Sequence, residues 1–546
     1  MKIVIVGGVA GGAGTVARLR RMNEDAEIIV FERGKHLSFA NCGLPYFIGG
    51  TIEDRNNLFV VKNQLFADRF DIDVRPEQEV VGIDVEKKTV TAKDVVTGKE
   101  YQESFDKLVL SPGASPVKPQ IKGVESNRIF TLRNIPDADN IREFVTKHQA
   151  KKAVVVGGGF IGLEMVENLH KLGLDVTLIE MQNQVMATLD FSMAAIVHTT
   201  LKQNNINLIL SKGVAGFEEK DNQLSVKLDN GDTLSTDIAI LSIGVRPEIQ
   251  LAKEAGIEIG KLGGIKVNEY MQTSNPDVYA LGDAVEVIHP ITKQPALIPL
   301  AGPANKQARI VADNIVFGNK AKYKGSYGVS IAKIFDLTAA SAGANAKMLK
   351  KSGIKYISSY THSASHATYY PGAKQMSIKI TFSPETGELY GAQVVGFDGV
   401  DKRMEMLAGV IQHGGTVQDL CELEQAYAPP YSSAKDPVNM AGFVANNILT
   451  GKVKIVHWHS IADDDFKLDV RTPKEFSEGH ISGSVNIPLD DLRGRMGELP
   501  NNRRIVVNCA IGLRAYIACR ILIQNGFDDV VNLSGGYKTY LPATTS

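Results

Sequence analysis

Short runs of consecutive apolar residues, each ending at glycine or at an acidic residue, recur along the chain. The segments 2–6 and 27–31, each apolar after one charged residue, form one pair, and the segments 153–156 and 175–179, the latter apolar except for Asp175 and Thr177, form a second. A continuous apolar run of this length is typical of a strand buried on both faces of a sheet. A helical segment separates the two runs of each pair, so the order strand–helix–strand predicts parallel α/β units.

The turn after the first run is rich in glycine. It reads Gly-Gly-Val-Ala-Gly-Gly from Gly7 to Gly12, and the next run ends at Glu32, 20 residues after Gly12. Glycines allow a pyrophosphate to approach the backbone, the helix N-terminus attracts its charge, and the acid holds a ribose hydroxyl. Val9 stands where the fingerprint has its middle glycine, so the match rests on the complete strand–turn–helix–strand context.

The second turn fits the fingerprint fully, with Gly157, Gly159 and Gly162 in place and Glu164 following. The next run ends at Glu180, 18 residues after Gly162. Glu180 is expected to bind the ribose 2′-hydroxyl and to repel a 2′-phosphate, which favours NADH over NADPH. A solvated acid at a strand end is the alternative, and whether NADPH also binds is left open.

Two dinucleotide turns about 150 residues apart indicate one FAD and one NAD(P)H. Two further strand ends follow, at residues 106–114 and at residues 275–284, the latter closing in Gly-Asp. With these four motifs, residues 1–450 resemble the two-dinucleotide-binding flavoproteins that include disulfide reductases and NADH oxidases. The resemblance implies that Asp283 contacts the ribityl–pyrophosphate part of FAD and that the nicotinamide stacks near Glu164.

Cys42 follows the first turn without a second cysteine within two to five residues, which excludes an internal redox disulfide. Residues 38–46 are similar to those of coenzyme A disulfide reductases and their persulfide-reducing relatives. The resemblance implies that Cys42 forms a mixed disulfide or persulfide with substrate. A thiolate that attacks a sulfur–sulfur bond then needs an electron donor to regenerate it. Two alternatives stay open: a merely packed cysteine, and a sulfenic acid in an NADH oxidase or peroxidase.

Residues 366–372 and 427–437 resemble the dimerisation domain of coenzyme A disulfide reductases, which implies a homodimer. In those enzymes two tyrosines reach the partner subunit's cysteine, and the matching positions here are Tyr369 and Tyr427. A phenol can donate a hydrogen bond to a thiolate or protonate a leaving thiol. Simple packing of tyrosines beside prolines is the alternative.

The same resemblance implies where coenzyme A binds. Two arginines three positions apart on one helix face suit its phosphates, although a solvated basic face is the alternative. Some relatives carry lysine where Phe70 stands, so a phosphate contact is lost there. The matching contact residues are Arg18, Arg21, Ser38, Asn41 and Asn305.

The last 90 or so residues resemble a rhodanese domain, on the segments 467–471, 475–488, 504–514 and 532–537. Cys509 stands between a strand end and a helix start, where backbone N–H groups and the helix N-terminus stabilise a persulfide anion. Arg514 closes this six-residue loop and would add charge or rigidity. Cys519 and Cys421 are interpreted as structural.

Composition narrows the function classes. The chain has 546 residues, a formal net charge of −1 and no block of like charges, which disfavours a nucleic-acid partner. No apolar run approaches the roughly 18 residues that span a bilayer, and no signal peptide is expected. Four cysteines in so long a chain indicate free thiols in a reducing cytoplasm. No metal site is expected.

These observations predict an α/β protein with two Rossmann-like nucleotide-binding domains, an α+β dimerisation domain and an α/β rhodanese domain. We expect FAD binding in residues 1–115 and 245–325, NADH binding in 116–244, dimerisation in 326–450 and the rhodanese domain in 457–546. The expected activity is NADH-dependent reduction of persulfide, polysulfide or coenzyme A disulfide through Cys42, with Cys509 handling sulfane sulfur. The alternatives are an NADH oxidase or peroxidase and a flavin redox sensor without turnover.

Overall fold

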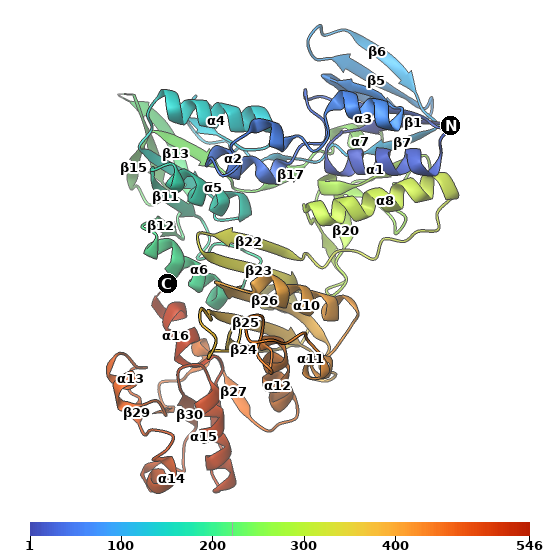
Figure 1. The fold of residues 1–546 in the computed structure, drawn as a ribbon. Helices are drawn as coiled ribbons and strands as arrows, with labels where there is room; N and C mark the ends of the chain where they lie inside the picture. The colour runs from blue at the N-terminus through green and yellow to red at the C-terminus, as the bar shows by residue number, and fades with distance from the viewer. Residues whose placement is uncertain (221, 546) are drawn as a thin grey trace. The chain divides into compact units, whose positions relative to one another are not determined.

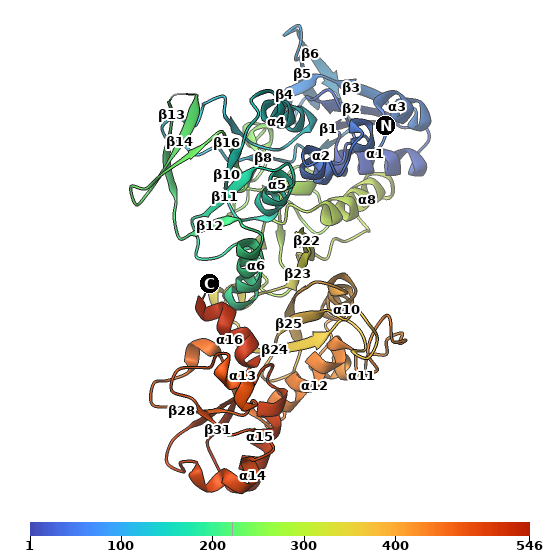
Figure 2. The same ribbon diagram turned by 60° about the vertical axis from the view of Figure 1, so that its left-hand side comes forward.

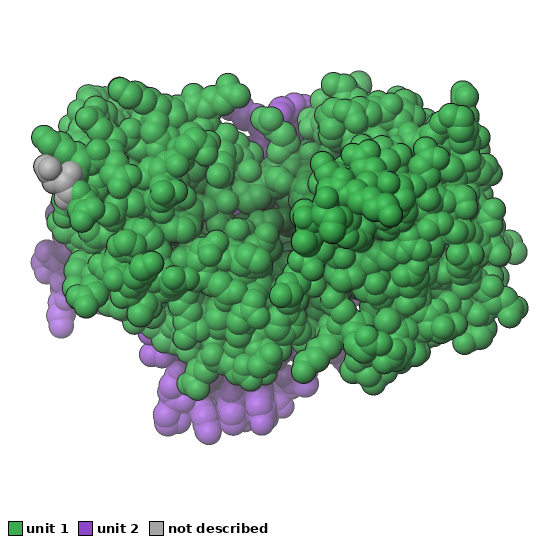
Figure 3. Space-filling view, turned by 90° about the horizontal axis from the view of Figure 1, so that it is seen from above, with its two compact units in different colours: residues 1–183, 209–328 green, residues 184–208, 329–546 purple. Residues whose placement is uncertain are grey.

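The computed structural model describes residues 1–220 and 222–545 and divides into two compact units. Unit 1 comprises Met1–Asn183 and Ile209–Gly328, and unit 2 comprises Gln184–Leu208 and Val329–Ser546. Figure 3 colours the two units separately. Among the described residues, no helix is long and apolar enough to cross a membrane.

The first sheet of unit 1 is parallel and has the strand order β19-β7-β1-β2-β3. Its strands are β1 (Lys2–Val6), β2 (Glu27–Glu32), β3 (Asp73–Pro76), β7 (Lys107–Leu110) and β19 (Val278–Ala280). Helices α1 (Ala10–Met22) and α8 (Ala301–Phe317) lie side by side, as Figures 1 and 2 show. The apolar runs form the core, since β1 is almost wholly buried, and the predicted strands and helix are confirmed.

The second sheet of unit 1 contains the parallel strands β11-β10-β16-β9. Their bounds are β9 (Ile129–Phe130), β10 (Lys152–Val156), β11 (Asp175–Glu180) and β16 (Ile238–Leu241). Helix α5 (Phe160–Lys171) follows β10 directly, as the glycine turn predicted, and α4 (Ile135–Lys147) starts from a capping box at Asn134. Both glycine turns thus sit at the carboxyl ends of central parallel strands, the usual place for a nucleotide.

Smaller elements complete unit 1. Two antiparallel sheets have the orders β4-β5-β6 and β13-β14-β15, a short pair joins β17 to β8, and β20 pairs with both β18 and β21. The strands are β4 (Gln78–Asp84), β5 (Thr89–Asp94), β6 (Glu100–Ser104), β8 (Ala114–Pro116), β13 (Val214–Lys220), β14 (Gln223–Leu228), β15 (Thr233–Thr236), β17 (Val245–Pro247), β18 (Ile265–Lys266), β20 (Val285–Ile288) and β21 (Pro295–Ala296). The helices are α2 (Leu44–Ile48), α3 (Asn63–Phe70) and α7 (Gln250–Glu254).

Unit 2 begins with an antiparallel sheet of order β22-β23-β26-β25-β24. Its strands are β22 (Ser330–Ile334), β23 (Leu337–Gly343), β24 (Ile357–Ala364), β25 (Gln375–Phe382) and β26 (Leu389–Gly396). The helices of this part are α6 (Phe191–Gln203), α9 (Ala346–Lys351), α10 (Val400–Gln412), α11 (Val417–Glu422) and α12 (Pro437–Leu449). α10 packs on β23 and β26, and α12 packs on β24.

The C-terminal part of unit 2 is a parallel sheet of order β27-β31-β30-β28-β29 around its own apolar core. The strands are β27 (Lys454–Val456), β28 (Phe466–Asp469), β29 (Val485–Asn486), β30 (Ile505–Asn508) and β31 (Val530–Leu533). The helices are α13 (Pro473–Ser477), α14 (Leu492–Arg495), α15 (Leu513–Gln524) and α16 (Gly536–Thr545). Cys509 therefore lies between a strand end and a helix start, as the sequence predicted.

Candidate active site

The two glycine turns repeat one geometry. Gly7 has φ +94° and Gly157 has φ +105°, conformations that a residue with a Cβ rarely adopts. A Cβ at Gly7 would also overlap the carbonyl of Ser111, and one at Gly157 would overlap that of Ser242. Gly12 and Gly162 pack in the same way on the carbonyls of these first glycines. Each helix can therefore start close to its strand and turn its N-terminus outward.

The acidic residues at the ends of β2 and β11 accept hydrogen bonds from these turns. Glu32 accepts a hydrogen bond from the Gly8 N–H at 2.9 Å, and Glu180 accepts one from the Gly158 N–H at 2.7 Å. A carboxylate can accept about four hydrogen bonds, so both acids keep capacity for a ribose hydroxyl. The backbone bonds fix the carboxylates where a dinucleotide ribose would bind.

A cavity of about 360 Å³ opens beside the first turn. Helix α1 begins there without a side-chain cap, which leaves its N–H groups and positive end available to a pyrophosphate. Burial raises the pKa of Asp283, an effect that Arg133 opposes from 3.9 Å. The cavity suits FAD, and its lining includes Gly7, Glu32, Asn41, Arg133 and Asp283.

The second glycine turn has open space around Gly159. A Cβ at Gly159 would meet no atom within 4 Å, and α5 starts there without a side-chain cap. An uncapped helix N-terminus facing open space is suited to a second pyrophosphate. These residues therefore fit a nicotinamide dinucleotide.

Cys42 lies in a one-turn 3-10 helix, Asn41–Gly43, and is exposed. Loss of hydration around the thiol raises its pKa, and the carboxylates of Glu164 and Asp283 raise it further. Burial also raises the pKa of Glu164 to about 7, although a hydrogen bond from the Tyr46 hydroxyl at 3.3 Å favours the charged form. The carboxylates near Cys42 in unit 1 thus favour its protonated thiol form. Hydrogen-bond donors from outside these residues would be needed to stabilise the thiolate.

The residues expected to contact coenzyme A are only partly free to do so. Arg18 forms an ion pair with Asp313 of α8 at 2.7 Å, so one face of its guanidinium is already occupied. Arg21 donates to the Ala17 carbonyl, and Asn305 donates to the Ala301 carbonyl. Ser38 has φ +48° and donates its backbone N–H to the Gly8 carbonyl. Asn41 lines the cavity described above.

Tyr369 and Tyr427 come together in unit 2, with 2.7 Å between their hydroxyl oxygens. Their exposed fractions are 74% and 47%, so the hydrogen-bonded pair faces outward. The buried guanidinium of Arg403 donates to the Ser365 carbonyl and to Asp436, so it joins the segment that leads into Tyr369 to the segment that follows Tyr427.

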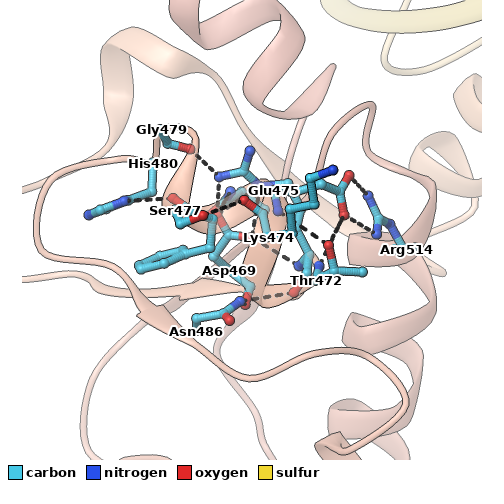
Figure 4. A network of polar contacts seen from close by, with 12 residues as sticks. Asp469, Thr472, Lys474, Glu475, Ser477, Gly479, His480, Asn486 and Arg514 are labelled. Carbon is cyan, nitrogen blue, oxygen red and sulfur yellow. Dashed lines mark hydrogen bonds and ion pairs between the residues drawn. The ribbon is translucent and has the colours of Figure 1, made fainter.

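Cys509 is almost fully buried, at 1% exposure, and the Gly512 N–H donates to its sulfur at 3.1 Å. Arg514, in the first turn of α15, makes a bidentate ion pair with Glu475 at 2.6 and 2.8 Å. Arg514 lowers the pKa of Glu475 to about 2. Figure 4 shows this pair at the edge of a larger polar network that includes Asp469. The arrangement holds a cation beside the loop of an N–H-stabilised sulfur.

The other two cysteines lie in helices of unit 2. Cys519 lies inside α15 with 0% exposure, and Cys421 lies in α11, where it donates to the Val417 carbonyl. Within the part of the chain that the structure describes, no group of three or more His, Cys, Asp or Glu could hold a metal ion.

Three residues that contact the candidate site residues were not predicted from the sequence. Tyr46 lies in the segment around Cys42, and its hydrogen bond reaches Glu164, which is 118 positions away in the sequence. Arg133 pairs with Asp283, and Glu475 pairs with Arg514. No sequence signal indicates either pair, because only the folded chain brings the partners together.

Family models match this chain in three separate segments. The model of the pyridine nucleotide-disulphide oxidoreductase family matches residues 1–305, that of the family's dimerisation domain matches 329–437, and that of the rhodanese-like domain matches 458–543. A coenzyme A disulfide reductase of Staphylococcus haemolyticus is 37% identical over 447 residues, which is 82% of this chain and 100% of that protein.

Solved structures extend the likeness to the C-terminal part. Reduced CoADR-RHD of Bacillus anthracis is 49% identical with a TM-score of 0.97, and the match covers 99% of this chain and 98% of that one. An NAD-dependent persulfide reductase from A. fulgidus is 38% identical with a TM-score of 0.94, covering 99% and 100%. A water-forming NADH oxidase from Lactobacillus brevis is 28% identical, with a TM-score of 0.79, and covers 83% of this chain and 99% of its own. The chain belongs to the pyridine nucleotide-disulphide oxidoreductase family of flavoprotein oxidoreductases, and it carries a C-terminal rhodanese-like domain.

Proposed function

We propose that the protein is an NADH-dependent reductase of coenzyme A persulfide, polysulfide and coenzyme A disulfide. The observation that carries this proposal is the combination of a lone exposed cysteine beside the first nucleotide turn with a second cysteine in an N–H-lined loop. Relatives named coenzyme A disulfide reductase and NAD-dependent persulfide reductase support the substrate class.

Family membership implies FAD and a pyridine nucleotide. We assign FAD to the cavity lined by Gly7, Glu32 and Asp283, and NADH to the turn at Gly159 with Glu180 on its ribose. When bound, FAD supplies the two-electron chemistry that links NADH oxidation to sulfur reduction. The cofactor domains follow as residues 1–115 with 245–325 and residues 116–244.

Cys42 attacks the sulfur–sulfur bond of the substrate as a thiolate. The bond breaks, one sulfur stays on Cys42 as a persulfide or mixed disulfide, and the other leaves with the electron pair and takes up a proton. Two electrons from NADH then return Cys42 to the thiolate, releasing hydrosulfide or coenzyme A. Arg18, Arg21, Ser38, Asn41 and Asn305 are assigned to coenzyme A.

The donors that the Cys42 thiolate requires come from a second copy of the chain. We assign this role to the partner subunit's Tyr369 and the partner subunit's Tyr427. The outward-facing phenol pair supports the assignment, because a phenol hydrogen bond stabilises a thiolate. The dimerisation-domain match supports a homodimer built from residues 326–450.

Cys509 accepts sulfane sulfur in the rhodanese domain, residues 457–546, and passes it to Cys42 or to coenzyme A. Arg514 adds positive charge at the persulfide loop. Free thiols at all four cysteines are in keeping with a reducing, cytoplasmic setting.

Anaerobic NADH consumption with coenzyme A persulfide, coenzyme A disulfide and polysulfide tests the proposal. Cys42→Ser should lose activity with every substrate, whereas Cys509→Ser should keep reduction of small coenzyme A substrates and lose thiosulfate-linked delivery. Full activity of Cys42→Ser would overturn the proposal. Oxygen uptake stoichiometric with NADH and indifferent to sulfur substrates would identify an oxidase instead.

A further inference from the structure

A buried histidine that the proposed chemistry does not use connects the two sheets of unit 2. His362 lies on β24, and its Nε2 is 3.1 Å from the Gly535 carbonyl oxygen and 2.9 Å from the Thr539 Oγ1. Its Nδ1 is 2.8 Å from the Oγ of Ser377 on the neighbouring strand β25. A side chain of the antiparallel sheet thus contacts the turn and first helical turn of α16.

The contacts define which nitrogen of His362 carries the proton. A carbonyl oxygen only accepts, so Nε2–H donates to Gly535, and Nδ1 accepts from the Ser377 hydroxyl. Burial, together with the charge of Lys538, lowers the pKa of His362 to about 3. His362 therefore stays a neutral donor of fixed orientation at every pH at which the enzyme would work.

The other side of the same turn holds the Cys509 loop. The first N–H groups of α16 donate into that loop, from Tyr537 to the Cys509 carbonyl at 2.8 Å and from Lys538 to the Ala510 carbonyl at 2.9 Å. Gly536 lies so close that a Cβ there would come within 2.9 Å of the Gly512 nitrogen. That nitrogen is the one whose N–H donates to the Cys509 sulfur.

A second contact fixes the turn from the same strand. The backbone N–H of Tyr360 donates to the Ser534 hydroxyl at 3.2 Å. Ser534, Gly535 and Gly536 are therefore held between β24 on one side and the Cys509 loop on the other. A displacement of this turn would move the carbonyls of Cys509 and Ala510, and with them the N–H of Gly512.

We propose that His362 is a positioning residue for Cys509, which it serves by holding the turn at residues 534–536 against the persulfide loop. The proposal rests on the assignment of Cys509 as the sulfur-accepting thiol. In the affected step, the Cys509 thiolate attacks the outer sulfur of thiosulfate. The sulfur–sulfur bond breaks, sulfite leaves with the electron pair, and the sulfane sulfur remains as a Cys509 persulfide. His362 touches none of the reacting atoms.

The test uses the full-length holoenzyme and thiosulfate as sulfur donor. The first readout is the single-turnover rate of sulfite release, and the second is the alkylation rate of Cys509 by iodoacetamide. His362→Leu removes the donor, and His362→Gln restores an N–H of similar reach. Thr539→Val removes the second acceptor from the helix side without altering β24.

Two controls separate positioning from general damage. Thr361→Val changes an equally buried position on β24 whose hydroxyl has no partner among the described residues. Reduction of coenzyme A disulfide, which depends on Cys42, reports whether each variant is folded and loaded with cofactors.

His362→Leu should slow sulfite release and Cys509 alkylation about tenfold, the effect of losing one buried hydrogen bond. His362→Gln should stay within about twofold of the unchanged enzyme. The rates of Thr539→Val should fall between those of His362→Leu and His362→Gln, and Thr361→Val should have the rates of the unchanged enzyme. Equal rates in His362→Leu and Thr361→Val, or no rescue by His362→Gln, would overturn the proposal. If the unchanged enzyme releases no sulfite, the assignment of Cys509 fails instead.

Discussion

Arg403 is a buried cation that joins the two tyrosine-bearing segments, and replacing it should loosen both of them. Its side chain is 1% exposed and donates to Asp436 at 2.7 Å, to the Ser365 carbonyl at 2.8 Å and to the Ser432 hydroxyl at 3.3 Å. Arg403→Met keeps an unbranched apolar side chain at this position and removes every donor. Asp436 is then left as a buried carboxylate without its counter-charge.

The magnitude follows from that unpaired charge. Removing one partner of a buried ion pair costs about 3–5 kcal/mol. Burial opposes ionisation of Asp436, yet hydrogen bonds from Arg403 and Ser432 outweigh it and hold the pKa of Asp436 below its usual value. A lowered pKa stabilises the fold above the unfolded pKa of about 4, and this stability is lost as pH falls through the folded pKa. The penalty of Arg403→Met should therefore shrink under acid conditions.

The assay is the urea midpoint of the first unfolding transition, with hydrogen exchange read in residues 365–372 and 427–437. Arg495→Met is the matched control, since it breaks an ion pair with Glu498 that is exposed on both sides. Arg403→Met should lower the midpoint and speed exchange in both segments, and Arg495→Met should change neither. Equal effects of the two substitutions would refute the reasoning.

Three further predictions follow from single side chains. Glu164→Gln should lower the pKa of Cys42, and the difference in its alkylation rate from the unchanged enzyme should appear above about pH 7, where Glu164 ionises, and vanish below; an unchanged pH profile would contradict this. Glu180→Ala should reduce the preference of kcat/KM for NADH over NADPH by about tenfold or more, because a charge-assisted hydrogen bond to the ribose is lost; an unaltered ratio in steady-state kinetics with both nucleotides would contradict this. Glu475→Gln should slow sulfite release by releasing Arg514, while the part-exposed pair contributes only about 0–1 kcal/mol to stability; a large fall in the unfolding midpoint would show a structural role instead.

The sequence predicted the parts of the site that depend on local pattern. Apolar runs and glycine spacing are sufficient for β1, β2, β10 and β11 and for the turns that follow them, because a Cβ at Gly7 or Gly157 has no room. The same holds for Cys509, whose place between a strand and a helix is a short-range property.

Long-range pairing was not predictable in this way. Arg18 was expected to be free for a phosphate, yet the contact of α1 with α8 pairs it with Asp313, 295 positions away. The contacts of His362 were not predictable either, because the sequence of one strand gives no sign that Gly535 and Thr539 lie beside it. The pKa of Cys42 is likewise raised by burial and by Glu164, which lies on α5, far along the chain from the cysteine.

The most direct test of the central claim follows a sulfur atom through the full-length enzyme. The holoenzyme is loaded with thiosulfate, freed of excess donor, and given coenzyme A and NADH without oxygen. Hydrosulfide is then quantified, and the remaining persulfide is mapped to cysteine peptides. The unchanged enzyme should release hydrosulfide stoichiometric with NADH and empty Cys509, whereas Cys42→Ser should release none. Hydrosulfide release by Cys42→Ser at the rate of the unchanged enzyme would contradict the account.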